Sequence, residues 1–192
     1  MEVHRLGPEH AAEYWELRLE ALRESPEAFL TTYQAAIAKE NPVDSTAKRL
    51  EAVSNYTYGA YMERQLVGVV TMLRKEQEKV AHKGDILAMY VTKSARANGV
   101  GYELLKKAKQ DAAEIGIEQL GLSVVADNLA AQHLYKKAGF TCYGVEKNAI
   151  KQENEYVDEI HMVCFLLNEK MTLDRRDLNE NKSMQRRPKS EK

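Results

Sequence analysis

Residues 89–110, MYVTKSARANGVGYELLKKAKQ, pass through three kinds of local structure without interruption. Met89–Val91 are strand formers, the middle of the stretch holds Gly99 and Gly101, and from Val100 onward the apolar residues follow a helical spacing. The turn therefore has to carry the chain from the end of a strand directly into the first turn of a helix. The sequence predicts that this helix N-terminus lies close to the end of that strand.

The turn from Arg96 to Gly101 has the properties of an anion-binding site. The N-terminus of a helix carries unpaired backbone N–H groups and a partial positive charge. Glycines leave space there for a phosphate, and Arg96 adds a full positive charge. Two phosphate-binding patterns are not met, because Leu104 replaces the third glycine of a dinucleotide fingerprint and no Gly-Lys pair precedes a Ser or Thr. By itself the pattern R-x-x-G-x-G also fits a plain tight turn.

The N-terminal part of the chain predicts one strand and two helices. Val3–Leu6 alternates briefly between apolar and polar residues, as a strand does. Glu9–Arg23 has a helical stripe that ends shortly before Pro26, and a weaker helical region begins at Pro42. The two apolar stripes consist of Trp15, Leu19 and Leu22 in the first helix, and of Val43, Ala47 and Leu50 in the second.

The middle of the chain changes to the composition of β-strands. Tyr56–Met62 and Leu66–Leu73 are rich in aromatic and β-branched residues, and the polar residues 63–65 between them indicate a hairpin. Asp85–Val91 is a third candidate strand. Three successive antiparallel strands are therefore predicted.

The second half of the chain alternates between helices and strands. A helix follows the turn and ends near Gly116, and a second helix is capped by Asp127 or Asn128 and followed by Gly139, where a left-handed C-terminal cap is needed. Their apolar faces hold Val100, Leu104, Leu105, Ala108 and Ala112 in the first helix, and Ala131, Leu134 and Ala138 in the second. The predicted strands of this half are Leu120–Val125, Phe140–Val145 and Tyr156–Leu166.

Composition is that of a globular protein with one domain. The 192 residues are 44% hydrophobic and 30% charged, and we predict a domain over residues 1–168 and a polar, mobile tail over residues 169–192. A net charge of -1 gives no indication of nucleic acid or an anionic membrane as a partner. Neither a secretory signal nor a membrane-spanning stretch is recognisable, so a cytoplasmic location is expected.

Several other kinds of site are not indicated by the sequence. Cys142 and Cys164 are too far apart for a zinc knuckle or a CxxC pair, and a disulfide scaffold is not expected. Ser123 lies in GLSVV, where Val125 replaces the glycine that a nucleophile elbow requires, so no hydrolase triad is indicated. The histidines have no HExxH or other ligand spacing, and no metal site is predicted. These histidines are His4, His10, His82, His133 and His161.

Two motifs about thirty residues apart resemble those of the GNAT superfamily, the acetyl-CoA-dependent N-acetyltransferases. MYVTKSARANGVGYELL is similar to the cofactor motif of that family, and NLAAQHLYKKAGF (Asn128–Phe140) to its second motif. Ala21–Tyr33 is similar to an N-terminal segment of a bacterial subgroup, and Glu155–Leu166 to its closing strand. The resemblance extends over about Val3–Leu167. It departs at Lys93–Ala95, where proline, glutamate or tyrosine is common, but there the backbone is expected to do most of the binding.

The resemblance implies a GNAT fold of the α/β class. In that fold a mixed, mostly antiparallel sheet is flanked by helices, and two parallel strands splay apart. The implied cosubstrate is acetyl-CoA, with its pantetheine arm bonded to the strand backbone like a missing strand and its pyrophosphate on the N–H groups of the turn. The residues implied to bind it are Met89, Tyr90, Val91, Arg96, Ala97, Asn98, Gly99, Val100, Gly101, Asn128 and Tyr135.

The resemblance further implies an acyltransferase that acetylates a primary amine by direct attack, without an acyl-enzyme. A backbone N–H near Met89 or Tyr90 would donate to the oxyanion, and Tyr135 matches the catalytic general-acid tyrosine of the family. A phenol with a pKa near 10 and a thiol with a pKa near 8.5 can share a proton without a large perturbation. A half-buried helix residue with a solvated hydroxyl is the alternative interpretation of Tyr135.

The general base and the acceptor stay open at this point. Asp85, Asp158 and Glu159 are candidate bases, each of which also fits a plain surface charge, and a water relay is the alternative to all three. The acceptor is expected to bind near Glu27–Tyr33 and Asn148–Tyr156. The acidic residues in and beside the second segment, which would suit a cationic amine, are Glu153, Glu155, Asp158 and Glu159.

The predicted partner is a small-molecule amine or a peptide, such as a polyamine, an amino acid derivative or a protein N-terminus. A homodimer is also left open, and neither nucleic acid nor a membrane is expected as a partner. The alternative function is a sensor or interaction module that binds CoA on the same fold, with the basic residues of the tail as its contact.

Overall fold

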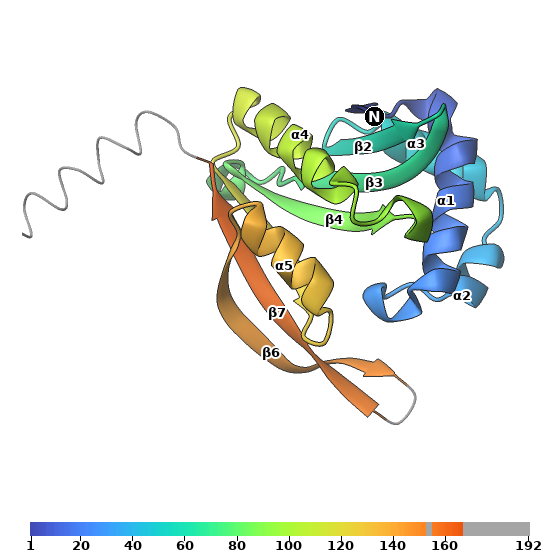
Figure 1. Cartoon of the computed structure of the whole chain (residues 1–192). Helices are drawn as coiled ribbons and strands as arrows, with labels where there is room; N and C mark the ends of the chain where they lie inside the picture. Colours follow the sequence, from blue (N-terminus) through green and yellow to red (C-terminus); the bar gives the residue numbers. More distant parts are fainter. Residues whose placement is uncertain (153–154, 167–192) are drawn as a thin grey trace, which may run out of the picture.

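In the computed structural model, which describes residues 1–152 and 155–166, seven strands form one mixed sheet with helices on both faces (Figure 1). The strand order is β1-β2-β3-β4-β5-β7-β6, in which β4 and β5 run parallel and the other neighbours antiparallel. This is the predicted fold class. The strands are β1 (Glu2–Arg5), β2 (Asn55–Met62), β3 (Gln65–Arg74), β4 (Lys83–Val91), β5 (Gln119–Val125), β6 (Thr141–Gln152) and β7 (Glu155–Phe165). The α-helices are α1 (Ala11–Glu24), α2 (Tyr33–Ile37), α3 (Pro42–Glu51), α4 (Val100–Glu114) and α5 (Leu129–Lys137).

Helix α4 covers one face of the sheet, and its predicted apolar stripe is confirmed. All five predicted residues of α4 are buried and belong to the main hydrophobic cluster. Tyr135 of α5 and Ala138, the residue that follows this helix, join the same cluster. Each large apolar side chain removed from water in this layer contributes about 1.5–3 kcal/mol.

Helices α1 and α3 belong to the other face, and here the predicted stripe of α1 is partly wrong. Of that stripe Leu22 is buried, whereas Trp15 and Leu19 are only half-buried. A period of 3.6 residues allows two neighbouring stripes on one helix, and the second cluster, with Leu50 and Val69, selects the other one. The buried residues of α1 are Ala11, Tyr14, Leu17, Ala21 and Leu22.

Strands β2, β3 and β4 form the predicted succession of antiparallel strands. Glu63 and Arg64 join β2 to β3 with φ angles of 50° and 67°, the backbone conformation that a tight two-residue hairpin requires. β4 begins at Lys83, two residues before its predicted start at Asp85.

Strands β6 and β7 form a hairpin that is longer than predicted. The predicted strand Phe140–Val145 continues to Gln152, so most of Asn148–Tyr156, which joined the two predicted strands, is itself strand. In Figure 1 this hairpin projects away from the rest of the molecule. The residues of β6 are mainly exposed, and without a buried face its sequence has no alternation that would mark the strand.

The predicted tail, residues 169–192, lies outside the described residues. None of the helices that the structure describes is long and apolar enough to cross a membrane. Cys142 is exposed, Cys164 is buried, and both are free thiols.

Candidate active site

The β4–β5 pair opens after a short paired stretch. Its ladder ends where Asp85 lies opposite Gly121, although β4 continues to Val91 and β5 to Val125. Beyond this point the strands diverge, and in Figure 1 β2–β4 and β6–β7 run in different directions. The implied separation of two parallel strands is therefore present.

A β-bulge in β4 accompanies the opening. Val69 of β3 lies opposite Tyr90 and Thr71 opposite Leu87, so β4 has one residue more than β3 over this stretch. Ala88 takes up the extra bend with a φ of 51°, a conformation that costs an alanine about 1–2 kcal/mol. Beyond Asp85 the backbone of β4 has no ladder partner on β5, so the groups on that side are free to bond a ligand.

A cavity of about 1060 Å³ lies at this opening. Its wall is built from β4, β5, the turn before α4, helix α5 and the segment around the 3-10 helix Pro26–Ala28. Every residue implied to bind the cofactor lines it except Asn98. The residues in question are Met89, Tyr90, Val91, Arg96, Ala97, Gly99, Val100, Gly101, Asn128 and Tyr135. Their contacts with a cofactor stay predictions.

The turn before α4 presents an open helix N-terminus. Gly99 is the N-cap residue and makes no side-chain cap, so no N-cap side chain satisfies the first N–H groups of α4. Gly99 has a φ of 77°, and an added Cβ would meet nothing within 4 Å, so glycine serves the backbone conformation here. An added Cβ on Gly101 would lie 2.9 Å from Leu134 Cδ2, so this glycine serves the packing of α5 against α4. The groups that this turn offers to an anion are therefore its backbone N–H groups, and anion binding here stays a prediction.

Arg96 ties this turn to the N-terminal part of the chain. Its Nε donates to the Val91 carbonyl at 3.0 Å, and its Nη2 donates to Ser25 Oγ at 3.3 Å. The guanidinium carbon lies 5.7 Å from the centre of the Tyr90 ring, and the Tyr90 hydroxyl donates to Glu20 of α1 at 2.9 Å. Arg96 is nevertheless exposed, so its charge can also face an anion at the turn.

Tyr135 reaches the cavity from α5. Of the two predicted caps Asn128 is the one present, because its Oδ1 accepts the Ala131 N–H at 3.0 Å. The Tyr135 side chain is 8% exposed and contacts the edge of Phe140, with ring centres 6.0 Å apart. Burial raises the pKa of Tyr135 to about 12, above the ordinary value assumed from the sequence. The phenol therefore keeps its proton at neutral pH and is available as a hydrogen-bond donor.

The candidate bases differ in their surroundings. Asp85 lines the cavity but is ion-paired with Lys75. Asp158 does not line it, and the Lys147 ammonium, 2.7 Å away, holds the pKa of Asp158 below its usual value together with the N–H of Asn148. Glu159 does line the cavity. The lowered pKa makes Asp158 a poor proton acceptor, and Asp85 is already paired with Lys75. Glu159 is therefore the best placed of the three candidate bases.

Three side chains from three different strands are joined by hydrogen bonds across the sheet, beside the opening. Ser123 Oγ of β5 lies 2.8 Å from Nδ1 of His161 in β7, and Nε2 of His161 lies 3.1 Å from Glu146 Oε2 of β6. Ser123 and His161 both line the cavity. The sequence indicated no hydrolase triad, and Ser123 does lie in a regular strand and not on an elbow. The sequence analysis did not foresee the contacts among the three side chains. Only the register of three strands brings these residues together, so their spacing in the sequence carries no signal.

The two segments expected to bind the acceptor have different positions. Residues 27–31 of the segment Glu27–Tyr33 line the cavity, and binding of the acceptor there stays a prediction. No described residue of Asn148–Tyr156 does, because the β6–β7 hairpin carries that segment away. Among the acidic residues expected there, Glu159 lines the cavity, Glu155 and Asp158 do not, and Glu153 lies outside the described residues.

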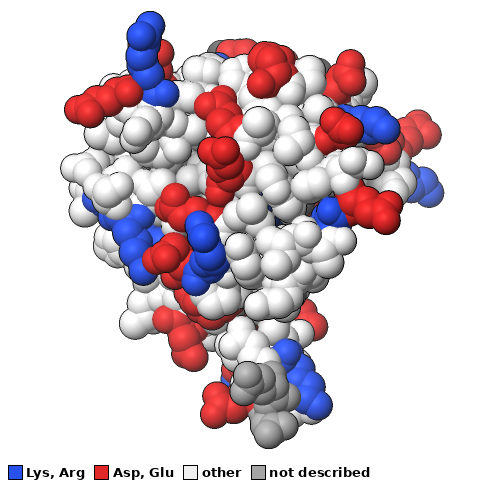
Figure 2. All heavy atoms as spheres, turned by 90° about the vertical axis from the view of Figure 1, so that its right-hand side faces the viewer, with Lys and Arg blue, Asp and Glu red and all other residues white. Residues whose placement is uncertain are grey.

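Charges of both signs are interspersed on the side of the molecule that carries α1 and α2 (Figure 2). Three acidic residues of α1 have defined partners: Glu13 accepts from the Tyr61 hydroxyl, Glu20 from Tyr90, and Glu24 pairs with Lys93. The acidic side chains of α1 therefore hold this helix to the sheet and to the loop before α4.

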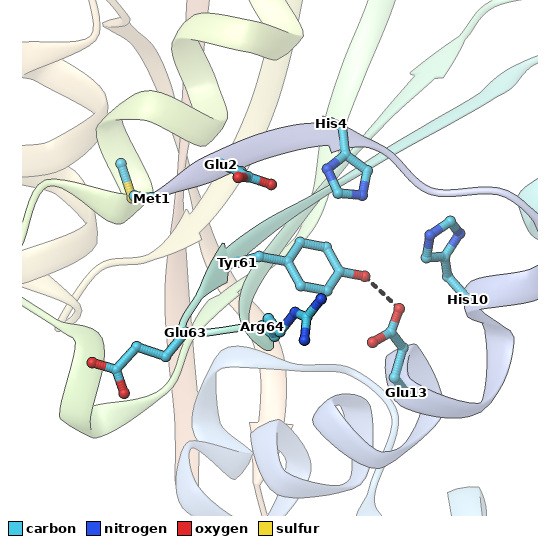
Figure 3. Close-up of a pocket in the computed structure, with 8 residues that line it drawn as sticks. All are labelled: Met1, Glu2, His4, His10, Glu13, Tyr61, Glu63 and Arg64. Atoms are coloured by element: carbon cyan, nitrogen blue, oxygen red, sulfur yellow. Dashed lines mark hydrogen bonds between the residues drawn. The ribbon is translucent and has the colours of Figure 1, made fainter.

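A second cavity of about 410 Å³ lies at the β1 edge of the sheet (Figure 3). The His4 ring stacks on Tyr61 with ring centres 4.8 Å apart, and the Tyr61 hydroxyl points to Glu13. His10 Nδ1 accepts the Gly7 N–H at 3.0 Å. Tyr61, Glu13 and His10 thus each have a hydrogen-bond partner. Within the described ranges, no cluster of three or more His, Cys, Asp or Glu could hold a metal ion.

Fold and site together define an α/β protein whose mixed sheet opens between two parallel strands around a cavity. An open helix N-terminus lies on the wall of this cavity, with a buried tyrosine from the next helix. The chain belongs to the acetyltransferase (GNAT) family, since the sequence model of that family matches residues 13–140. The resemblance noted in the two motifs is thereby confirmed.

Solved structures show the same fold. The acetyltransferase of the GNAT family from Streptococcus pneumoniae superposes with a TM-score of 0.76 at 23% identity, over 86% of this chain and 99% of that chain. An acetyltransferase from Salmonella typhimurium, solved with its cofactor acetyl-CoA, has a TM-score of 0.74 at 15% identity, over 88% of this chain and 95% of that chain. At such identities the likeness concerns the fold alone.

Curated relatives match over shorter stretches. The chain is 48% identical over 50 residues to the chloroplastic GCN5-related N-acetyltransferase 7 of Arabidopsis thaliana, or 26% of this chain and 18% of that protein. It is 30% identical over 82 residues to N-alpha-acetyltransferase 30 of Dictyostelium discoideum, or 43% of this chain and 44% of that protein. The chain thus spans less than half the length of either relative.

Proposed function

We propose that this protein transfers the acetyl group of acetyl-CoA to a primary amine by direct attack of the amine on the thioester. The observation that carries the proposal is the single cavity into which the separated edge of β4, the open N-terminus of α4 and the side chain of Tyr135 all face. Family membership and a fold shared with an acetyl-CoA-bound acetyltransferase support the choice of acyl donor.

The proposed position of the cofactor follows from its chemistry. The amide groups of the pantetheine arm would bond the free backbone side of Met89–Val91 as an extra strand does. The diphosphate would lie on the N–H groups at Gly99–Gly101, where the helix dipole and Arg96 favour negative charge. This orientation directs the thioester toward the opening between β4 and β5, on the side of Tyr135.

Two donors are proposed for the transition state. A backbone N–H near Met89 or Tyr90 would donate to the oxyanion of the tetrahedral adduct, in the manner of an oxyanion hole. The Tyr135 hydroxyl, protonated at neutral pH, would donate to the departing sulfur. Since the pKa of Tyr135 is about 12 and that of an ordinary thiol is near 8.5, transfer of the proton to a free thiolate is uphill. Tyr135 would therefore act as a hydrogen-bond donor to the departing sulfur and release its proton only as another one replaces it.

The acceptor is proposed to be a cationic primary amine. Glu27, Asp85 and Glu159 line the cavity, and such carboxylates favour a positively charged group. A relative named N-alpha-acetyltransferase 30 adds a peptide N-terminus to the polyamines and amino acid derivatives worth testing. A homodimer and a cytoplasmic location stay predictions.

Calorimetry and a thiol-release assay test the proposal. Acetyl-CoA is titrated into the protein, and free thiol is then followed with spermidine, lysine derivatives and peptides that carry a free N-terminus. We expect saturable binding and release of CoA that depends on an amine. Binding without such release would favour the alternative of a CoA-binding sensor, and no binding at millimolar acetyl-CoA would end both.

A matched pair of variants tests where the diphosphate binds. Ala97 is exposed beside the helix N-terminus and has a φ of 64°, so Ala97→Glu and Ala97→Gln share the same backbone strain and differ in charge. Ala97→Glu should weaken acetyl-CoA binding about tenfold relative to Ala97→Gln, because a carboxylate a few ångströms from a phosphate costs about 1 kcal/mol or more. Equal affinities would place the diphosphate elsewhere.

A further inference from the structure

The hydrogen-bonded series Ser123–His161–Glu146 lies next to the opening of the sheet. Ser123 and His161 occupy opposite positions of the β5–β7 ladder, and Glu146 comes from β6, the next strand. The two links measure 2.8 Å, from Ser123 Oγ to His161 Nδ1, and 3.1 Å, from His161 Nε2 to Glu146 Oε2. The three side chains therefore form a continuous hydrogen-bonded path that begins at the cavity wall.

The series Ser123–His161–Glu146 and the side chain of Tyr135 lie on opposite faces of the sheet. Leu122 and Val124 of β5 are buried in the cluster that also holds Tyr135. Side chains alternate along a strand, so Ser123, which is exposed, points to the other face. The 3-10 helix Pro26–Ala28 contacts β5, and residues 27–31 line the cavity with Ser123. An acceptor entering on this face would meet the thioester opposite Tyr135.

The hydrogen-bond partners of His161 determine which atoms of the three side chains carry protons. A carboxylate only accepts hydrogen bonds, so with Glu146 ionised the proton of a neutral His161 ring is on Nε2. Nδ1 is then an acceptor, and the Ser123 hydroxyl donates to it. A lone pair of Ser123 Oγ is left for a donor in the cavity. The arrangement is ready to receive one proton at Ser123 and hold it on His161.

The proposed acetyl transfer requires such an acceptor. An alkylammonium has a pKa near 10.4 and must lose a proton before its nitrogen can attack a carbonyl carbon. An imidazole is the side chain that ordinarily exchanges a proton near neutral pH. Asp85 is engaged with Lys75, and Asp158 lies off the cavity with a lowered pKa. Among the three candidate carboxylates, Glu159 is the remaining competitor.

We propose that Ser123 and His161 are the proton-accepting pair for the amine, with Glu146 as the residue that positions the imidazole. This rests on the proposed acetyl transfer. An ammonium N–H bond breaks as its proton goes to Ser123 Oγ, and the Ser123 proton goes to His161 Nδ1. The amine nitrogen bonds the acyl carbon, the C–S bond breaks, and the sulfur takes the Tyr135 proton. The amine nitrogen loses a second proton, which replaces the one that the Tyr135 hydroxyl gave to sulfur. His161 then returns its proton to water.

Other charged or titratable groups share the surroundings of His161. Glu146 and Tyr143 face it from β6, with the Tyr143 ring centre 6.0 Å from that of His161. The cavity also holds Glu159 of β7, Asp85 of β4, and Glu27 and Arg18 from the N-terminal region. The pH dependence of a His161 variant must therefore be compared with that of a Glu159 variant.

The test is the pH profile of kcat/KM for the amine that gives the fastest thiol release. The unmodified protein should lose activity toward acidic pH through a limb in the imidazole range. His161→Gln should lower turnover at pH 7 by about 10²-fold and abolish that limb, with acetyl-CoA affinity unchanged. His82→Gln is the same change away from the cavity, and it should leave both the turnover at pH 7 and the acidic limb of the profile unchanged. Glu146→Ala should lower turnover about tenfold with acetyl-CoA affinity unchanged, because the ring loses the acceptor that holds its proton on Nε2, and the conservative Glu146→Asp should restore most of the turnover.

Three outcomes would overturn the inference. The limb could persist in His161→Gln, it could disappear in Glu159→Gln instead, or mass spectrometry could detect an acetyl group on Ser123 after incubation with acetyl-CoA. The last result would assign the serine as a nucleophile. If the unmodified protein releases no thiol with any amine, the proposed function fails and this inference fails with it. Turnover in the unmodified protein with an unaltered His161→Gln profile overturns the inference alone.

Discussion

At the scale of single residues, Tyr135 is the group whose chemistry depends most on its surroundings. Its hydroxyl belongs to a ring that is 8% exposed and packed against Phe140. Desolvation disfavours the phenolate and raises the pKa of Tyr135 to about 12. The group is thus a firmly protonated donor on the wall of the cavity.

Tyr135→Phe tests this role. The variant keeps the ring and removes the donor, so turnover in acetyl transfer should fall about 10²-fold while the affinity for acetyl-CoA stays within about twofold. Steady-state kinetics and calorimetry measure the two quantities. Tyr102→Phe is the matched control, because Tyr102 of α4 lines the same cavity. Equal turnover in both variants would remove the assigned role from Tyr135.

At the scale of elements, the N-terminus of α5 sets the position of Tyr135. Asn128 Oδ1 accepts the Ala131 N–H, which satisfies one of the free donors in the first turn of the helix. Gln132 Nε2 donates to the Ala126 carbonyl at 2.7 Å and holds the same turn to the end of β5. The helix that carries the catalytic candidate is therefore anchored at the end nearer the opening.

Substitutions at Asn128 test the cap. Asn128→Ala should lower the free energy of unfolding by about 1 kcal/mol, whereas Asn128→Asp keeps a capping oxygen and should lose little. Chemical denaturation of both variants gives the comparison. An equal loss for Asp and Ala would mean that the amide nitrogen of Asn128, and not the cap, is what the fold requires.

At the scale of the whole molecule, buried phenols connect the fold to alkaline pH. Burial raises the pKa of Tyr90 and of Tyr135 to about 12 each, and it also raises the pKa of Tyr58 and of Tyr61. Between pH 10 and 12 the unfolded chain has lost phenol protons that the folded chain still holds. The stability from Tyr90 and Tyr135 is complete below pH 10 and is lost as the pH rises through 12.

Tyr135 gives this effect a size. A shift from 10 to about 12 in its pKa corresponds to roughly 2–3 kcal/mol that the folded state loses between those pH values. We expect the fall in unfolding free energy over this range to be smaller by that amount in Tyr135→Phe. The exposed Tyr143 supplies the control Tyr143→Phe, which should follow the unmodified protein. Parallel curves for all three proteins would contradict the burial argument.

Much of the fold could be predicted because its signals are local. The five-residue stripe of α4, the cap at Asn128 and the left-handed Gly139 with a φ of 91° each depend on a few neighbouring residues. The stripe of α1 was misassigned because its true partners, such as Leu50 and Val69, lie far away in the sequence. The predicted strand was shorter than β6 because an exposed strand has no buried face to impose alternation.

The sequence by itself determined the order of the seven strands and of four of the five α-helices, the glycine turn before α4 and the two motifs that resemble the family, since each is a property of a short stretch of chain. Only the tertiary structure decided where β4 leaves β5, how far burial raises the pKa of Tyr135, and which side chains meet across strands. Ser123, His161 and Glu146 are neighbours because the β5–β7–β6 register makes them so, and cross-strand register depends on packing over the whole sheet.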